Sequence, residues 1–309
     1  LNQHGGLMGS LIELARYSDP NTVNGDVPGI FASFLGPDPF SLLCVVILTS
    51  LGTWGLPQMV QKFYAIKSEK AVKTGTIVST FFAVIVAGGC YFLGGFGRLT
   101  AGAVETKPDG SIIYDSVIPT MIQNLPEILI AVVVILVLSA SMSTLSSLVL
   151  TSSSTLTLDF IKGTIVKNFS EKKQMLTMRA LVVVFIAISA IIAVVQYKSS
   201  VTFIAQLMGI SWGALAGAFL APFLYGLYWK GVTRAGVWAG FIAGVGITVS
   251  NMFIGYIASP INAGAVAMVA GLVIVPLVSL VTPKLKKEDV DEIFTCYEEK
   301  VVSTKKRNL

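Results

Sequence analysis

Hydroxyl-bearing side chains gather on one apolar stretch near the middle of the chain. The segment Ala131–Lys162 reads AVVVILVLSASMSTLSSLVLTSSSTLTLDFIK, and no charged residue interrupts it before Asp159. Ser143, Ser146 and Ser147 stand at i, i+3 and i+4, so a helix places them on one face. Neutral oxygens at this spacing, with backbone carbonyls, can replace the water shell of a small hard cation, which predicts a sodium site. The alternative is that the serines pack helices closely and hydrogen-bond to carbonyls four residues earlier.

An earlier apolar segment contains residues that interrupt helices. Gly52, Gly55 and Pro57 fall within the run TSLGTWGLPQMVQKF. Such interruptions indicate the unwound segment that forms the central binding site of a transporter, although a Pro-kinked helix whose glycines permit close packing is the alternative. The free N–H groups and positive dipole of an interrupted helix end suit a carboxylate. The candidate substrate contacts flank this break or stand early in a later span: Thr53, Trp54, Gln58 and Gln206.

The elements that must position these residues are membrane-spanning helices. Hydrophobic residues make up 54% of the 309 residues and charged residues 13%, with a mean hydropathy of +0.77. Seven apolar segments without charged side chains are long enough to cross a hydrocarbon core, which needs about 20 residues. These spans are Phe40–Val60, Gly75–Gly97, Ile128–Leu150, Ala180–Tyr197, Val201–Tyr228, Ala235–Ile257 and Asn262–Thr282. The composition therefore predicts an all-α, polytopic membrane protein.

Basic residues are distributed unevenly between the connections. If the seven spans alternate in direction, only Arg16, Arg98, Lys107 and Lys198 of the 22 lysines and arginines fall on one side. The positive-inside rule then predicts that residues 1–39 are extracellular. Within this segment, LMGSLIELARY is expected to form a short amphipathic helix. The rule places residues 40–283 in the plasma membrane and the tail 284–309 in the cytoplasm. Apolar tail residues at helical spacing, from Val290 to Val301, predict a helix on the membrane surface.

Other kinds of site find little support in the residue pattern. Cys44, Cys90 and Cys296 form no spacing motif, which argues against a disulfide framework or a zinc site. The lysines stand in connections between spans, so the net charge of +5 does not indicate a nucleic-acid partner. The spans hold no nucleophile–base pair and no metal cluster. We expect no enzymatic activity and no cofactor, with sodium as a coupling ion.

Four stretches resemble the sodium:solute symporter family, whose members include proline, pantothenate, sugar and sialic acid symporters. They are GLPQMVQKFYAIKSEKAVKTG at Gly55–Gly75, LSASMSTLSSLVLTSSSTLTLDFIKG at Leu138–Gly163, SWGALAGAFLAPFLYGLYWKGVTRAGVWAG at Ser211–Gly240, and the last span into VTPKLKK. The first is similar to the proline and pantothenate branches. There the family has Gly-x-Pro-His, and this chain departs from that pattern with Gln58 at the histidine position.

The resemblance implies the inverted-repeat fold of the leucine-transporter type. The seven spans would be the second five-helix repeat and two accessory helices, with the first repeat upstream of this sequence. Matched residue by residue, the family's sodium site corresponds to the Ala140 carbonyl and the hydroxyls of Ser143 and Thr144. Some relatives bind a second sodium through hydroxyls that match Ser143, Ser146 and Ser147 and an aspartate on an earlier helix.

The function that follows is sodium-coupled symport of a small solute, expected to carry a carboxylate, such as proline, pantothenate or another monocarboxylate. A proton-coupled carrier and a sodium-coupled sugar symporter are the alternatives. An ion channel would need polar stripes on several helices, whereas the hydroxyls here gather on one. A sensor would need a signalling domain, and the tail after Lys284 is short for one.

Overall fold

The computed structural model describes residues 5–18, 27–56, 59, 66, 68–105, 112–123, 125–166, 168–199 and 204–297. The chain divides into two compact units. The first joins Leu1–Gly102 to Ile204–Leu309, and the second is Ala103–Phe203.

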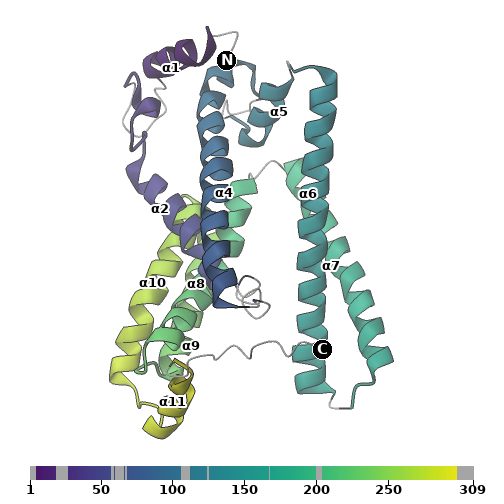
Figure 1. Ribbon diagram of the computed structural model, residues 1–309, viewed down its shortest axis with the longest axis vertical. Helices are drawn as coiled ribbons and strands as arrows, with labels where there is room; N and C mark the ends of the chain where they lie inside the picture. The colour runs from purple at the N-terminus through teal and green to yellow at the C-terminus, as the bar shows by residue number, and fades with distance from the viewer. Residues whose placement is uncertain are drawn as a thin grey trace. The chain divides into compact units, whose positions relative to one another are not determined.

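Three long helices that pack side by side form the core of the first unit: α8 (Ile204–Tyr228), α9 (Arg234–Ile254) and α10 (Pro260–Val281) (Figure 1). Small residues allow their backbones to approach closely, which is how membrane helices commonly associate. A methyl group added to Gly213 of α8 would overlap Gly264 of α10, and one added to Gly244 of α9 would overlap the Gly217 carbonyl of α8.

A short broken helix packs against this core. Helix α2 (Pro39–Ser50) begins where the Asp38 carboxylate accepts a hydrogen bond from the Ser41 amide at 3.0 Å, with proline at the first helical position. It is followed by the 3₁₀ turn η3 (Gly52–Gly55). The fully buried Leu48 of α2 packs with Ala216 and Leu220 of α8 and Met268 of α10.

The remaining elements of the first unit lie before and after these helices. They are α1 (Gly6–Arg16), η2 (Ile30–Ala32), α4 (Glu69–Gly95), most of η5 (Phe96–Ala103), α11 (Lys287–Phe294) and η8 (Thr295–Tyr297). Helix α1 lies in the segment predicted to form a short amphipathic helix, and α11 lies in the tail segment predicted to be helical. Val301, at the far end of the predicted tail helix, lies outside the described residues.

The second unit is built on two long helices, α6 (Glu127–Ser154) and α7 (Glu171–Ser199), which pack against each other. A π-helical segment, η7 (Thr155–Ile165), continues α6; there Val166 N–H donates to the Ile161 carbonyl at 2.8 Å. The short elements η6 (Tyr114–Ser116) and α5 (Val117–Ile122) precede α6.

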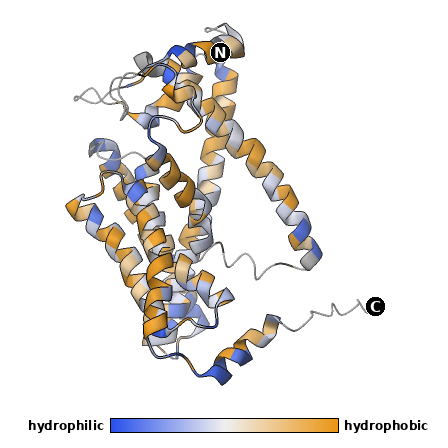
Figure 2. Ribbon diagram, turned by 90° about the vertical axis from the view of Figure 1, so that its left-hand side faces the viewer, coloured by the Kyte–Doolittle hydropathy of each residue, from blue (hydrophilic) through white to orange (hydrophobic). Residues whose placement is uncertain are grey.

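Six helices of the described chain are long and apolar enough to cross a membrane, and α2 with η3 forms a shorter apolar segment, Pro39–Gly55. Hydrophobic residues dominate the long helices, as the colouring in Figure 2 shows. The prediction of an all-α, polytopic membrane protein is confirmed. Of the first predicted span, Phe40–Val60, the residues Pro57, Gln58 and Val60 lie outside the described residues.

Candidate functional site

The predicted helix break lies between α2 and η3. The Leu51 amide still donates to the Ile47 carbonyl at 2.9 Å, as in an α-helix, whereas the Trp54 amide donates to Leu51 at 3.0 Å, only three residues back. Leu56 is then extended, with φ −87° and ψ 116°, which is the conformation favoured before a proline. The interruption predicted from Gly52, Gly55 and Pro57 is confirmed up to Leu56.

The two glycines also allow η3 to fit closely against α8 and α10. A methyl group on Gly55 would lie 2.8 Å from the Cα atom of Ala216 and 2.9 Å from the Cβ atom of Leu220. One on Gly52 would lie 3.1 Å from the Cε atom of Met268 and 3.5 Å from the Trp212 ring. We call the surface formed by Trp212, Ala216, Leu220 and Met268 the η3 socket. The glycines therefore permit close packing, which was the alternative to a binding-site role for this motif.

The candidate substrate residues on η3 differ in their surroundings. The Thr53 hydroxyl donates to the Ser50 carbonyl at 3.0 Å, so it satisfies one carbonyl at the end of α2. The Trp54 side chain is 58% exposed, and the η3 socket does not bury it. Gln58 lies outside the described residues.

Gln206 stands in the first turn of α8, the helix that supplies most of the η3 socket. It precedes Trp212 by six residues, about 9 Å along a helix axis. Gln206 is partly buried and belongs to the same unit as Thr53 and Trp54. Helix α8 therefore carries the Gln206 amide and also packs against η3, where the helix break lies.

The candidate sodium ligands all lie on α6, in the second unit. Ala140, Ser143, Thr144 and Ser147 follow the spacing i, i+3, i+4 and i+7, which places them on one helical face. All four residues are exposed on α6, as is Ser146. Almost all of α6 before Val149 is exposed in this unit, so exposure alone does not distinguish this face.

Hydrogen bonding back along α6, the alternative role for its hydroxyls, also occurs. Ser146 donates to the Met142 carbonyl at 2.7 Å, and Thr151 donates to the Ser147 carbonyl at 2.8 Å. A hydroxyl that donates in this way keeps lone pairs for a cation. The bond at Ser146 is therefore compatible with either role.

Hydroxyl-bearing residues continue past the predicted sodium site to the end of α6 and into η7, where two of them are buried. Ser153 is fully buried and donates to the Val149 carbonyl at 2.6 Å. Thr157, in the π-helical segment, is also fully buried, and its hydroxyl oxygen has no hydrogen-bond partner among the described residues. The run of serines and threonines in the sequence continues to Thr157, but it does not by itself predict the burial of this residue.

The electrostatic character of α6 suits a hard cation held by neutral oxygens. Glu127 opens the helix, and no charged residue follows in the sequence until Asp159. Among the described residues, histidine, cysteine, aspartate and glutamate form no group of three that could hold a metal ion. Hydroxyl and carbonyl oxygens are the ligands that hard cations prefer.

Comparison with known proteins identifies the family of this chain. The family model described as "Sodium:solute symporter family" matches residues 17–244, which include the break at η3, the hydroxyl helix α6 and the whole of α8. This chain belongs to the sodium:solute symporter family. Membership of a transporter family accounts for the multi-pass helices and makes sodium the expected coupling ion.

Two similar proteins are named sodium/proline symporters, which is more specific than the family name. A sodium/proline symporter of Haemophilus influenzae is 31% identical over 229 residues, which cover 72% of this chain and 43% of that protein. A sodium/proline symporter of Staphylococcus aureus is 29% identical over 262 residues, or 81% of this chain and 50% of that protein. The chain thus spans about half the length of these relatives. The search of solved structures found no significant match.

Proposed function

We propose that the full-length protein is a secondary active transporter that couples inward sodium movement to the uptake of a small carboxylate-bearing solute, such as proline, pantothenate or another monocarboxylate. The observation that carries the proposal is the face of α6 with Ala140, Ser143, Thr144 and Ser147. It presents neutral oxygens on an apolar helix in a sodium:solute symporter.

The coupling ion is sodium rather than a proton. A proton relay needs titratable groups inside the membrane, where they are expensive to keep and therefore functional. The long uncharged part of α6 supplies hydroxyls instead. The Ala140 carbonyl with the Ser143 and Thr144 hydroxyls forms the proposed site, and Ser146 and Ser147 contribute to a second one.

The solute site lies at the break between α2 and η3. A carboxylate is attracted by the N-terminal end of an interrupted helix, through its free N–H groups and dipole, whereas α2 ends at the break with its carbonyls. Thr53, Trp54, Gln58 and Gln206 are the proposed contacts, and the names of the two relatives favour proline. A sugar would need several amides and hydroxyls to bind its ring hydroxyls, and the break offers only Thr53 and Gln58 for that purpose.

Transport then follows from a coupling free energy between the two sites. Sodium on α6 raises the affinity for solute, and by linkage the solute raises the affinity for sodium by the same factor. Movement of one helix group against another exposes the sites alternately, as in other transporters built from repeats.

The substrate assignment is tested by competition. The full-length protein is reconstituted into liposomes with a sodium gradient, and uptake is measured for labelled amino acids, pantothenate, other monocarboxylates and sugars, each with and without an excess of the unlabelled others. We expect one carboxylate class to compete and sugars to have no effect. Uptake of glucose or galactose without any carboxylate transport would contradict the assignment.

A further inference from the structure

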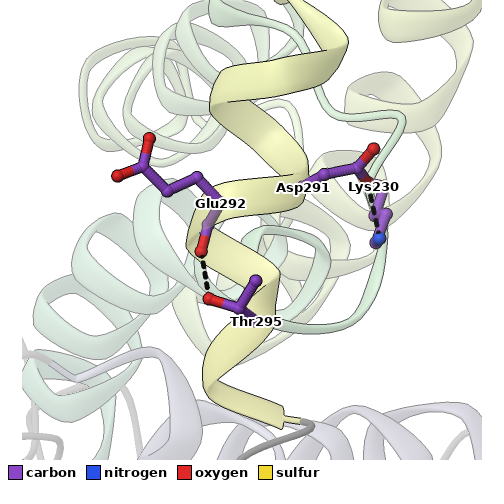
Figure 3. Close-up of polar contacts among 4 residues, drawn as sticks. All are labelled: Lys230, Asp291, Glu292 and Thr295. Carbon is purple, nitrogen blue, oxygen red and sulfur yellow. Dashed lines mark hydrogen bonds and ion pairs between the residues drawn. The ribbon is translucent and has the colours of Figure 1, made fainter.

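The tail helix α11 folds back onto the connection between α8 and α9. Lys230 of that connection forms an ion pair with Asp291 of α11, with 2.7 Å between Nζ and Oδ1 (Figure 3). The Lys230 ammonium also lies 5.4 Å from the centre of the Phe294 ring. Tyr297 donates a hydrogen bond to the Leu227 carbonyl at the end of α8, at 3.0 Å. Two contacts of α11 and one of the following η8 therefore hold this part of the tail against the connection between α8 and α9.

The contacts that hold α11 are exposed to solvent and individually weak. The Lys230 and Asp291 side chains are 54% and 45% exposed, and exposed ion pairs are weak and screened by salt. Ile293 of α11 is 68% exposed, and α11 contributes no buried residue. The loss of one of these contacts is therefore expected to shift α11 from the docked toward the released state.

The docking point is connected to α10 through aromatic side chains. The Trp229 ring, next to Lys230, packs edge-on against Tyr225 with 5.8 Å between ring centres. The Tyr225 hydroxyl donates to the Leu272 carbonyl of α10 at 2.8 Å. Leu272 in turn packs against the cluster of Leu48, Ala216, Leu220 and Met268.

This cluster contains three of the four residues of the η3 socket. Pro222 interrupts the hydrogen bonding of α8 between the socket and Tyr225, which makes the last turns of α8 easier to displace. A continuous series of contacts therefore runs from α11 to Gly55 and Gly52.

We propose that α11 is a reversible latch, which when docked through Lys230, Asp291 and Tyr297 holds the end of α8 and thereby restrains η3. Release of the latch loosens the η3 socket and increases access to Thr53. Where the proposed function holds, α11 thus controls the mobility of the solute site.

Docking is measured by the distance between two spin labels in the purified full-length protein. One label is placed on the exposed, native Cys296 and the other on Ala235→Cys, with the remaining cysteines replaced. We expect a narrow distance distribution in the parent and a broad one in both Lys230→Glu and Asp291→Lys. The double variant, which restores opposite charges, should return toward the narrow distribution.

Glu292→Lys is the matched control. It makes the same charge change one residue away, and the Glu292 carboxylate points away from Lys230 in Figure 3. We expect this variant to keep the parental distribution. Asp291→Asn is a milder variant, to be used if the charge reversals reduce the yield of folded protein.

The effect on the solute site is measured by alkylation of Thr53→Cys in a background without other cysteines. The single charge reversals should raise the alkylation rate about twofold to fivefold, the range that an exposed ion pair provides. The double variant should reverse the increase, and Glu292→Lys should cause none. An unchanged distance distribution, or a broadened one without faster alkylation, would overturn the latch. Neither readout requires transport, so a failure of the proposed symport remains distinguishable from a failure of the latch.

Discussion

At the scale of single residues, hydroxyls on α6 have two competing uses. A serine or threonine in a membrane helix can satisfy itself by bonding back to a carbonyl, as Ser146 and Ser153 do. It can also give its oxygen to a cation. Ser143 and Thr144 share a face with the Ala140 carbonyl position, and this arrangement favours the second use.

Replacement of these hydroxyls should weaken sodium binding specifically. In the full-length protein, Ser143→Ala and Thr144→Ala each remove one oxygen from an ion with few ligands. Bonds to charged groups contribute about 1.5–3 kcal/mol, so we expect the sodium concentration for half-maximal uptake to rise about tenfold. Thr80→Ala is the control, because Thr80 donates to the Thr76 carbonyl on another long helix. An unchanged half-saturation in both α6 variants would exclude the assignment.

The sequence predicted the helices that carry these residues, but it did not predict which hydroxyl side chains are buried. The charge-free run to Asp159 and the spacing of the serines were sufficient to predict the helix α6. The interruption after Ser50 was equally predictable, because glycine and proline have fixed backbone preferences. The burial of Thr157 was not predictable, because it depends on a π-helical segment that composition does not specify.

At the scale of elements, glycines determine how closely α8, α9 and α10 approach. Gly244 has the Gly217 carbonyl where its side chain would be, whereas Gly246 on the same helix has open space. Gly244→Ala should therefore lower the stability of the full-length protein by about 1–3 kcal/mol, as overpacking does. Gly246→Ala should be neutral or stabilising by up to about 1 kcal/mol. Thermal unfolding in detergent measures both; equal effects would contradict the packing.

The α11 latch should be insensitive to pH near neutrality. The hydrogen bond from Lys230, followed by the charges of Lys230 and Lys287, lowers the pKa of Asp291 below its usual value of 3.8. A carboxylate with a lowered folded pKa stabilises docking above the usual value, and this contribution is lost as the pH falls through the folded pKa. The spin-label distance should stay narrow from about pH 6 to 8 and broaden only in acid. Broadening between pH 8 and 6 would contradict the role of Asp291.

The docking of α11 could not be predicted from the sequence, although the helix itself could. The helical spacing of Val290, Ile293 and Phe294 predicted a helix in the tail, and α11 lies in that segment. Its docking depends on Lys230, which is 61 residues from Asp291 in the chain. No local pattern links the two positions, so only the three-dimensional structure reveals the pair.

At the scale of the whole molecule, the distribution of lysine and arginine is the evidence for orientation. We propose an extracellular start and a cytoplasmic tail in the plasma membrane. Cysteines introduced at Ser199 and, outside the described residues, at Ser303 test this in the full-length protein without its native cysteines. A membrane-impermeant reagent added outside should label Ser199→Cys only. Labelling of Ser303→Cys from outside would reverse the orientation.

The central claim is that a sodium gradient drives solute uptake by a transporter of which this chain spans about half the length. The share of the relatives that it covers, 43% and 50%, means that the complete protein must be used.

The most direct measurement is accumulation of labelled proline in liposomes that contain the full-length protein. Three conditions are compared at equal protein content: an inward sodium gradient, equal sodium on both sides, and an inward proton gradient without sodium. The account predicts accumulation above the external concentration with the sodium gradient, and only equilibration in the other two conditions. Equal accumulation with the proton gradient in the absence of sodium would contradict it.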